Sequence, residues 1–294
     1  MRRLVIAAAA TATFAAAGIR SEGPMAVAVV QGGGVLVTVA RTDDGEGWTP
    51  IEADAPSRWF FWPVADPAIE ASPFAPRKAY EIATVATGSA RCLAVATGMP
   101  QGIAPSGDIG IAVSSADARA EPVTAVEPAS ELGTWISARA ARPFHRAEDE
   151  ALTLEMEELP SRFPRFAERQ KLPIVWTRIV RQGAAQAPKK TYYLEGYKDY
   201  EGFRGRVDVG RIRTTGHVFV QFDGRRETAD AEVDLSDVEG RRSVSRLPLL
   251  VIHSGERALW TFRVRGYDDE SYEIFELSGS ARPPRVVAQA AAGC

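Results

Sequence analysis

The feature that most constrains the fold is a series of short apolar segments that begins after Leu172 and continues almost to the end of the chain. The segments are separated by turn residues and recur at roughly ten-residue intervals. They read PIVWTRIV, KTYYLEGY, GRVDVG, HVFVQF, AEVDL, PLLVIH, ALWTFRV and YEIFEL. Regularly spaced short strands with turn signals favour antiparallel pairing. We therefore predict an α+β fold that is mostly β, with antiparallel sheets or a partly open barrel in the C-terminal half.

One clear helix is predicted over residues 147–159, AEDEALTLEMEEL. Leu152, Met156 and Leu159 are spaced four and three residues apart and form one apolar stripe. Acidic residues crowd the first turn, where the helix dipole favours negative charge, and Pro160 ends the pattern.

These patterns divide the chain into five regions, with a change of architecture near residue 145. The predicted regions are a signal peptide (1–17), a β-rich N-terminal region (18–145), a helical linker (146–171), an antiparallel β domain (172–282) and a flexible tail (283–294).

The N-terminus, MRRLVIAAAATATFAAAG, has the layout of a secretory signal peptide. Two arginines precede an apolar run from Leu4 to Ala17, with small residues before the expected cleavage after Ala17. The run is too short to span a bilayer comfortably, and no cysteine near it offers a lipid anchor. We predict an exported bacterial protein, periplasmic or secreted, without a stable membrane anchor. A disordered alanine-rich tail is the alternative explanation.

Charge is balanced overall but uneven along the chain. The net charge of −3 gives no indication of a nucleic-acid partner. Residues 173–216 hold nine Lys or Arg against four Asp or Glu, whereas residues 227–239 hold six acids and no base. This asymmetry fits either an anionic ligand or two solvated faces of opposite sign.

The sequence carries no motif of a nucleophilic or metal-dependent enzyme. There is no G-x-S-x-G or H-E-x-x-H, and two cysteines and three histidines lack metal-ligand spacing. We therefore predict a protein that is not an enzyme and has no cofactor, catalytic residues or metal. A disulfide between Cys92 and Cys294 and a buried free thiol at Cys92 both remain open.

The candidate binding residues are basic and aromatic side chains of the predicted β domain. In HVFVQF, alternation turns Val218 towards the core and His217 to the opposite face. Arginines beside tyrosine-rich strands clamp carboxylates or phosphates and stack on sugars, but they also serve as ordinary exterior residues of strands. The candidate set is Arg211, Arg213, His217, Arg241, Arg242, His253 and Trp176.

The order of three blocks in residues 173–265 resembles the periplasmic peptidoglycan-binding family that is required for cell-shape integrity and supports a bifunctional wall synthase. In this family a Pro-led strand ending in Gln precedes a G-x-V-x-V strand leading to a His, and a double Arg, a Ser and a His follow. The matching residues are Pro173 and Gln182; Gly205, Val207, Val209, Arg211, Arg213 and His217; and Arg241, Arg242, Ser245 and His253. One extra residue precedes His217, an apolar run stands where the family is aromatic and acidic, and Ser254 replaces a proline.

The resemblance implies a non-catalytic periplasmic protein that binds peptidoglycan and regulates a penicillin-binding synthase through an activator lipoprotein. Arginines would then pair with stem-peptide carboxylates, and aromatic faces would cover sugar rings. The expected partners are thus peptidoglycan or wall-synthesis proteins. Two alternatives stay open: an envelope hydrolase whose carboxylates converge only in three dimensions, and a β module with a structural or protein-interaction role.

Overall fold

The computed structural model describes most of the segments that were predicted as strands, together with the helical region. The described residues are 25–31, 35–42, 48–49, 51, 58–64, 80–89, 92–95, 109–121, 123–155, 164–182, 190–201, 211–222, 226–237, 245–254, 257–265, 270–277 and 285–286. The predicted signal peptide and Cys294 lie outside them.

The N-terminal part forms a closed six-stranded antiparallel barrel in the order β1-β2-β5-β4-β3-β6, with β6 returning to β1. Its strands are β1 (Met25–Gln31), β2 (Val35–Thr42), β3 (Arg58–Val64), β4 (Tyr80–Ser89), β5 (Cys92–Val95) and β6 (Ile109–Val113). Gly110 is required inside the barrel, because a Cβ there would lie 2.3 Å from the ring of Phe61. Trp59 and Phe61 are fully buried.

Two five-stranded antiparallel sheets make up the C-terminal part. The central sheet has the order β12-β11-β10-β9-β8, and the second sheet has the order β16-β15-β14-β13-β7. The central sheet contains β8 (Val123–Ala125), β9 (Val175–Gln182), β10 (Lys190–Glu201), β11 (Arg211–Phe222) and β12 (Glu227–Asp237). The second contains β7 (Arg119–Glu121), β13 (Ser245–Ser254), β14 (Arg257–Arg265), β15 (Glu270–Leu277) and β16 (Arg285–Val286).

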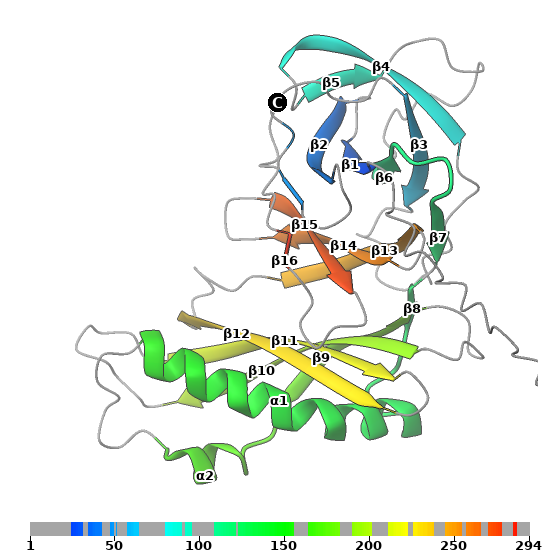
Figure 1. The fold of residues 1–294 in the computed structure, drawn as a ribbon. Coiled ribbons are helices and arrows are strands. Elements are labelled where there is room, and N and C mark those ends of the chain that lie inside the picture. Colours follow the sequence, from blue (N-terminus) through cyan, green and yellow to red (C-terminus); the bar gives the residue numbers. More distant parts are fainter. Residues whose placement is uncertain are drawn as a thin grey trace, which may run out of the picture.

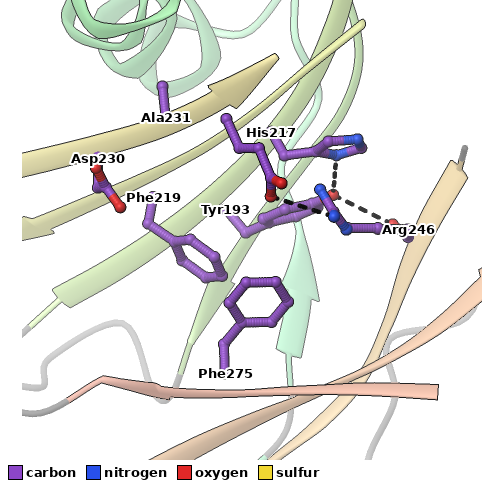
Figure 2. Close-up of a pocket in the computed structure, with 8 residues that line it drawn as sticks. Tyr193, His217, Phe219, Asp230, Ala231, Arg246 and Phe275 are labelled. Atoms are coloured by element: carbon purple, nitrogen blue, oxygen red, sulfur yellow. Dashed lines mark hydrogen bonds and ion pairs between the residues drawn. The ribbon is translucent and has the colours of Figure 1, made fainter. Parts of the chain in front are cut away.

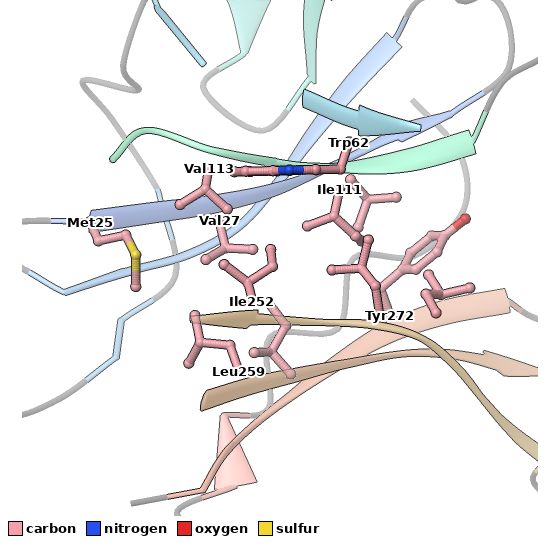
Figure 3. Packing of buried hydrophobic residues seen from close by; sticks show 12 residues of the cluster. Met25, Val27, Trp62, Ile111, Val113, Ile252, Leu259 and Tyr272 are labelled. Atoms are coloured by element: carbon pink, nitrogen blue, oxygen red, sulfur yellow. The ribbon is translucent and has the colours of Figure 1, made fainter. Parts of the chain in front are cut away.

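These units stack in four layers: helix α1, the central sheet, the second sheet and the barrel (Figure 1). Figure 3 shows the contact between the last two, where Val27, Trp62 and Ile111 of the barrel meet Ile252 and Leu259 of the second sheet. Other buried residues fill the space between the two sheets, and a third cluster joins α1 to the central sheet. Both sheets are therefore buried on both faces.

Burial on both faces explains the apolar run PLLVIH in β13. Leu250 and Ile252 pack towards the barrel, whereas Val251 packs towards the central sheet. A strand buried on both sides needs a continuous apolar run instead of alternation. His253 ends this run on β13 and pairs with Ala258 across the antiparallel hairpin.

Helix α1 (Glu131–Glu155) starts sixteen residues before the predicted position. The hydroxyl of Ser130 accepts a hydrogen bond from the backbone N–H of Gly133 at 3.0 Å and caps the helix. Pro143 lies inside the helix. A proline in mid-pattern normally ends or kinks a helix, which is why the sequence pattern missed the first sixteen residues of the helix. A short helix, α2 (Phe166–Arg169), follows before β9.

The fold class is confirmed, and the elements of the structure can be placed relative to the predicted region boundaries. The C-terminal half forms antiparallel sheets, and the closed barrel lies in the N-terminal region. The predicted boundary near residue 145 falls inside α1. Strands β7 and β8 come from the predicted N-terminal region but pair with β13 and β9. Strand β16, within the predicted flexible tail, pairs with β15.

Candidate functional site

The central sheet has two chemically distinct faces. Its helix face packs against α1 through Leu194 and Val218, and its intersheet face packs against the second sheet through Tyr193 and Phe219. The predicted alternation in HVFVQF is therefore present, but both sides of the strand are buried. Each face also carries a cluster of charged side chains.

On the intersheet face, Arg246 is the centre of the charged cluster. It is only 2% exposed. Its Nε donates to Glu273 Oε2 at 2.7 Å, its Nη2 lies 3.2 Å from Glu232 Oε2, and its backbone N–H donates to Glu195 Oε2 at 3.0 Å. Burial opposes the positive charge, but the two carboxylates of Glu273 and Glu232 outweigh it and raise the pKa of Arg246. Its Nη1 makes no hydrogen bond with any described residue.

Tyr193 links this arginine to His217. The tyrosine hydroxyl lies 2.8 Å from His217 Nδ1 and donates weakly to the carbonyl of Arg246 at 3.4 Å. Burial raises the pKa of Tyr193 well above its usual value, so the phenol stays protonated at all physiological pH values. His217 Nε2 lies 3.7 Å from Asp234 on the neighbouring edge strand.

Glu195 stands beside this group and has an unusual pKa. Burial raises its pKa, although Arg178 at 3.1 Å and the backbone N–H of Arg246 act in the opposite direction. The register of the strands explains the proximity, because Glu195 pairs directly with His217 across β10 and β11.

A cavity of about 200 Å³ opens beside Arg246 between the two sheets (Figure 2). Its lining comes from β10, β11, β12, β13 and β15 and consists of Tyr193, His217, Phe219, Asp230, Ala231, Glu232, Arg246 and Phe275. The rings of Phe219 and Phe275 reach towards one another from the two sheets, 5.6 Å apart between centroids. Asp230 is exposed at the outer strand, whereas Arg246 is buried. The cavity thus runs from a carboxylate at the surface to a guanidinium inside.

The structure brings only some of the predicted site residues to this cavity. His217 lines it. Arg213 lies on the same strand, but its Nε and Nη2 bind the carboxylate of Asp199 at 2.7 and 3.0 Å, and its guanidinium stacks on Tyr197. Arg211 begins β11, while Arg241 and Arg242 lie outside the described residues.

Trp176 and His253 do not line this cavity and lie elsewhere in the structure. Trp176 packs on the helix face, with its ring centroid 5.9 Å from that of Phe144. A bulge in the pairing of β9 with β10 shifts its register and turns the indole to this side. His253 Nε2 lies 2.9 Å from Gln182 Nε2 and 3.1 Å from Glu121 Oε2.

The residues that the sequence reasoning missed are Arg246, Tyr193, Glu195, Asp230, Glu232, Glu273, Phe219 and Phe275. Two signals were present in the sequence. Glu195 interrupts the apolar strand YYLEGY, and a charged residue within such a strand requires a partner when it is buried. The acidic segment that forms β12 was recognised, but only the fold shows that it lies beside His217 and Phe219.

A second charged cluster lies on the helix face. Lys198, only 2% exposed, donates from Nζ to His145 Nδ1 at 2.8 Å, to Glu148 Oε2 at 2.9 Å and to the carbonyl of Arg169 at 2.8 Å. An ammonium group has three donors, and all three are used here.

The other oxygen of Glu148 is equally well satisfied. Its Oε1 accepts hydrogen bonds from Tyr200 at 2.8 Å and Thr214 at 2.6 Å. Burial raises the pKa of Glu148, but the neighbouring His145 ring, the hydrogen bond from Thr214 and the charge of Lys198 outweigh it, so the pKa lies below its usual value. This cluster anchors α1 to β10 and β11.

Comparisons with known proteins give no relative from which a role could be transferred. No family model matches the chain, and neither the curated proteins nor the solved structures contain a significant match. Within the described residues, no group of three or more His, Cys, Asp or Glu side chains is arranged to hold a metal ion. No helix in the same part of the chain has the length and apolar character needed to cross a membrane.

Proposed function

We propose that this chain is an exported, non-catalytic envelope protein that binds peptidoglycan, alone or together with a wall-synthesis partner. The observation that carries the proposal is the cavity between the two sheets, where a buried arginine, surface carboxylates and two phenyl rings converge. Peptidoglycan offers short peptides with free carboxyl and amino groups on apolar stems. The cavity is smaller than a typical drug-sized pocket and suits one residue-sized group.

The charged side chains at the cavity support ligand binding better than they support glycosidic hydrolysis. A general acid for glycosidic cleavage needs a carboxyl with a raised pKa that faces the substrate. The pKa of Glu195 is raised, but this carboxyl is held by Arg178, by Ser245 at 3.4 Å and by the backbone of Arg246. It is not among the residues that line the cavity.

Sedimentation with purified sacculi tests the proposal. The mature chain is mixed with sacculi and centrifuged, and the pelleted fraction is measured together with soluble muropeptides in the supernatant. We expect the protein in the pellet and no release of muropeptides. A protein that stays in the supernatant would show that peptidoglycan is not its ligand, and release of muropeptides would support the hydrolase instead.

A further inference from the structure

We propose that the cavity binds a zwitterionic amino-acid head group, with an ammonium and a carboxylate on the same carbon. Diaminopimelate carries such a group at the free end of its side chain in peptidoglycan stem peptides. This inference rests on the proposed function and names the chemical group that the same site recognises.

Arg246 provides a hydrogen-bond donor for the carboxylate of the ligand. Arg246 lines the cavity, and its Nη1 is buried without a hydrogen-bond acceptor among the described residues. Its Nε donates to Glu273, and its Nη2 lies beside Glu232. A buried donor without an acceptor costs about 1–3 kcal/mol and more when it is charged. A ligand carboxylate that enters the cavity supplies this acceptor and forms a charge-assisted hydrogen bond.

Two carboxylates of the cavity lining can receive the ammonium of the ligand. Asp230 and Glu232 line the cavity from β12. A purely anionic group such as a phosphate would lie against both of these carboxylates. A zwitterion places its ammonium beside Asp230 and Glu232 and its carboxylate towards Arg246.

The two phenyl rings accommodate the remainder of the side chain. Phe219 and Phe275 contribute apolar walls from opposite sheets (Figure 2). Methylene groups that leave the head group would pack against these walls, and the ring faces also attract an ammonium. The combination of charge at one end and apolar walls distinguishes this site from a surface ion pair.

Titration calorimetry with three synthetic stem peptides tests the inference. The first peptide carries diaminopimelate, the second carries lysine and so keeps only the amine, and the third carries diaminopimelate with its side-chain carboxyl amidated. We expect the first to bind more than about tenfold more tightly than the other two, because each loses a hydrogen bond to a charged group. Equal affinities for the three peptides would overturn the inference, as would failure of the first to bind.

Asp230→Asn and Glu227→Gln form a matched pair of variants on the same edge strand. Both residues are exposed and each substitution removes one negative charge, but Glu227 binds Arg139 of α1 instead of lining the cavity. Asp230→Asn should weaken the diaminopimelate peptide several-fold, and Glu227→Gln should leave its affinity unchanged. Equal effects would mean that overall charge, not the cavity, attracts the peptide.

Sedimentation with sacculi separates failure of the inference from failure of the proposed function. If the chain pellets with sacculi while the three peptides bind equally, peptidoglycan binding stands and the zwitterion site is wrong. If neither sacculi nor peptides bind, both proposals fail.

Discussion

The two faces of the central sheet differ in how they satisfy the hydrogen-bond donors of a buried basic side chain. Each face buries a basic side chain at 2% exposure, Lys198 under α1 and Arg246 between the sheets. Lys198 uses all three donors of its ammonium, whereas Arg246 leaves Nη1 without an acceptor in the described part of the chain. A satisfied network is an anchor, and an incompletely satisfied one beside a cavity is a candidate binding site.

The two faces also differ in the size of the side chains that the central sheet contributes. On the helix face Gly216 lets Phe144 approach so closely that a Cβ would lie 2.3 Å from the ring. Gly196 admits Trp176 in the same way, with a Cβ position 2.6 Å from the indole. The opposite face carries large side chains such as Tyr193 and Phe219, and both of them line the cavity.

The largest expected effect comes from breaking the anchor on the helix face. Lys198→Met leaves Glu148 buried without its cationic partner, which typically costs about 3–5 kcal/mol. We expect a loss of this order in the free energy of unfolding, measured by urea denaturation. The double variant Lys198→Met with Glu148→Leu removes both charges and should recover part of the loss. If the single variant keeps wild-type stability, this cluster is not an anchor.

Two buried tyrosines allow the faces to be compared directly. Tyr200 donates to the carboxylate of Glu148, and Tyr193 contacts His217 at the cavity. Each Tyr→Phe substitution should cost about 1–3 kcal/mol, with Tyr200→Phe the larger because its acceptor is charged. Only Tyr193→Phe should change the affinity for the diaminopimelate peptide. An equal change in affinity for Tyr200→Phe would contradict the separation of the two faces.

Much of the architecture follows from local sequence patterns, whereas the site depends on register between distant strands. Alternation in HVFVQF correctly separates Val218 from His217 and Phe219. The pattern cannot show that a second layer covers each side, because this depends on β13–β15 and α1. The strand PLLVIH is the exception, since its unbroken apolar run is itself the signal of burial on both faces.

The predicted site is only partly recovered for the same reason. His217 reaches the cavity because β10 and β11 pair over their full length, which places it opposite Glu195. A bulge of one residue places Trp176 on the helix face, and no local sequence pattern predicts such a bulge. Arg246 follows the double arginine Arg241 and Arg242 in the sequence, but its role depends on carboxylates of three other strands.

The smallest expected effect is a difference in how the contributions of Glu195 and Glu148 to the free energy of unfolding depend on pH. Burial raises the pKa of Glu195 above 4.5, so on acidification the folded state binds a proton before the unfolded chain does. Ionised Glu195 therefore lowers stability above its folded pKa, and this penalty disappears as the pH falls from there to about 4.5. The pKa of Glu148 lies below 4.5, so its stabilising contribution is complete above 4.5 and is lost as the pH falls through its folded pKa.

Urea denaturation at a series of pH values from 7 down to 3 separates the pH ranges in which Glu195 and Glu148 act. Relative to Glu195→Gln, the wild type should gain stability as the pH falls from 7 to about 4.5. Relative to Glu148→Gln, it should lose stability below about 4.5, with a slope of at most about 1.4 kcal/mol per pH unit for a single site. Slopes of the same sign in both comparisons would mean that the two clusters share one environment, and the distinction between a sealed anchor and an open site would no longer hold.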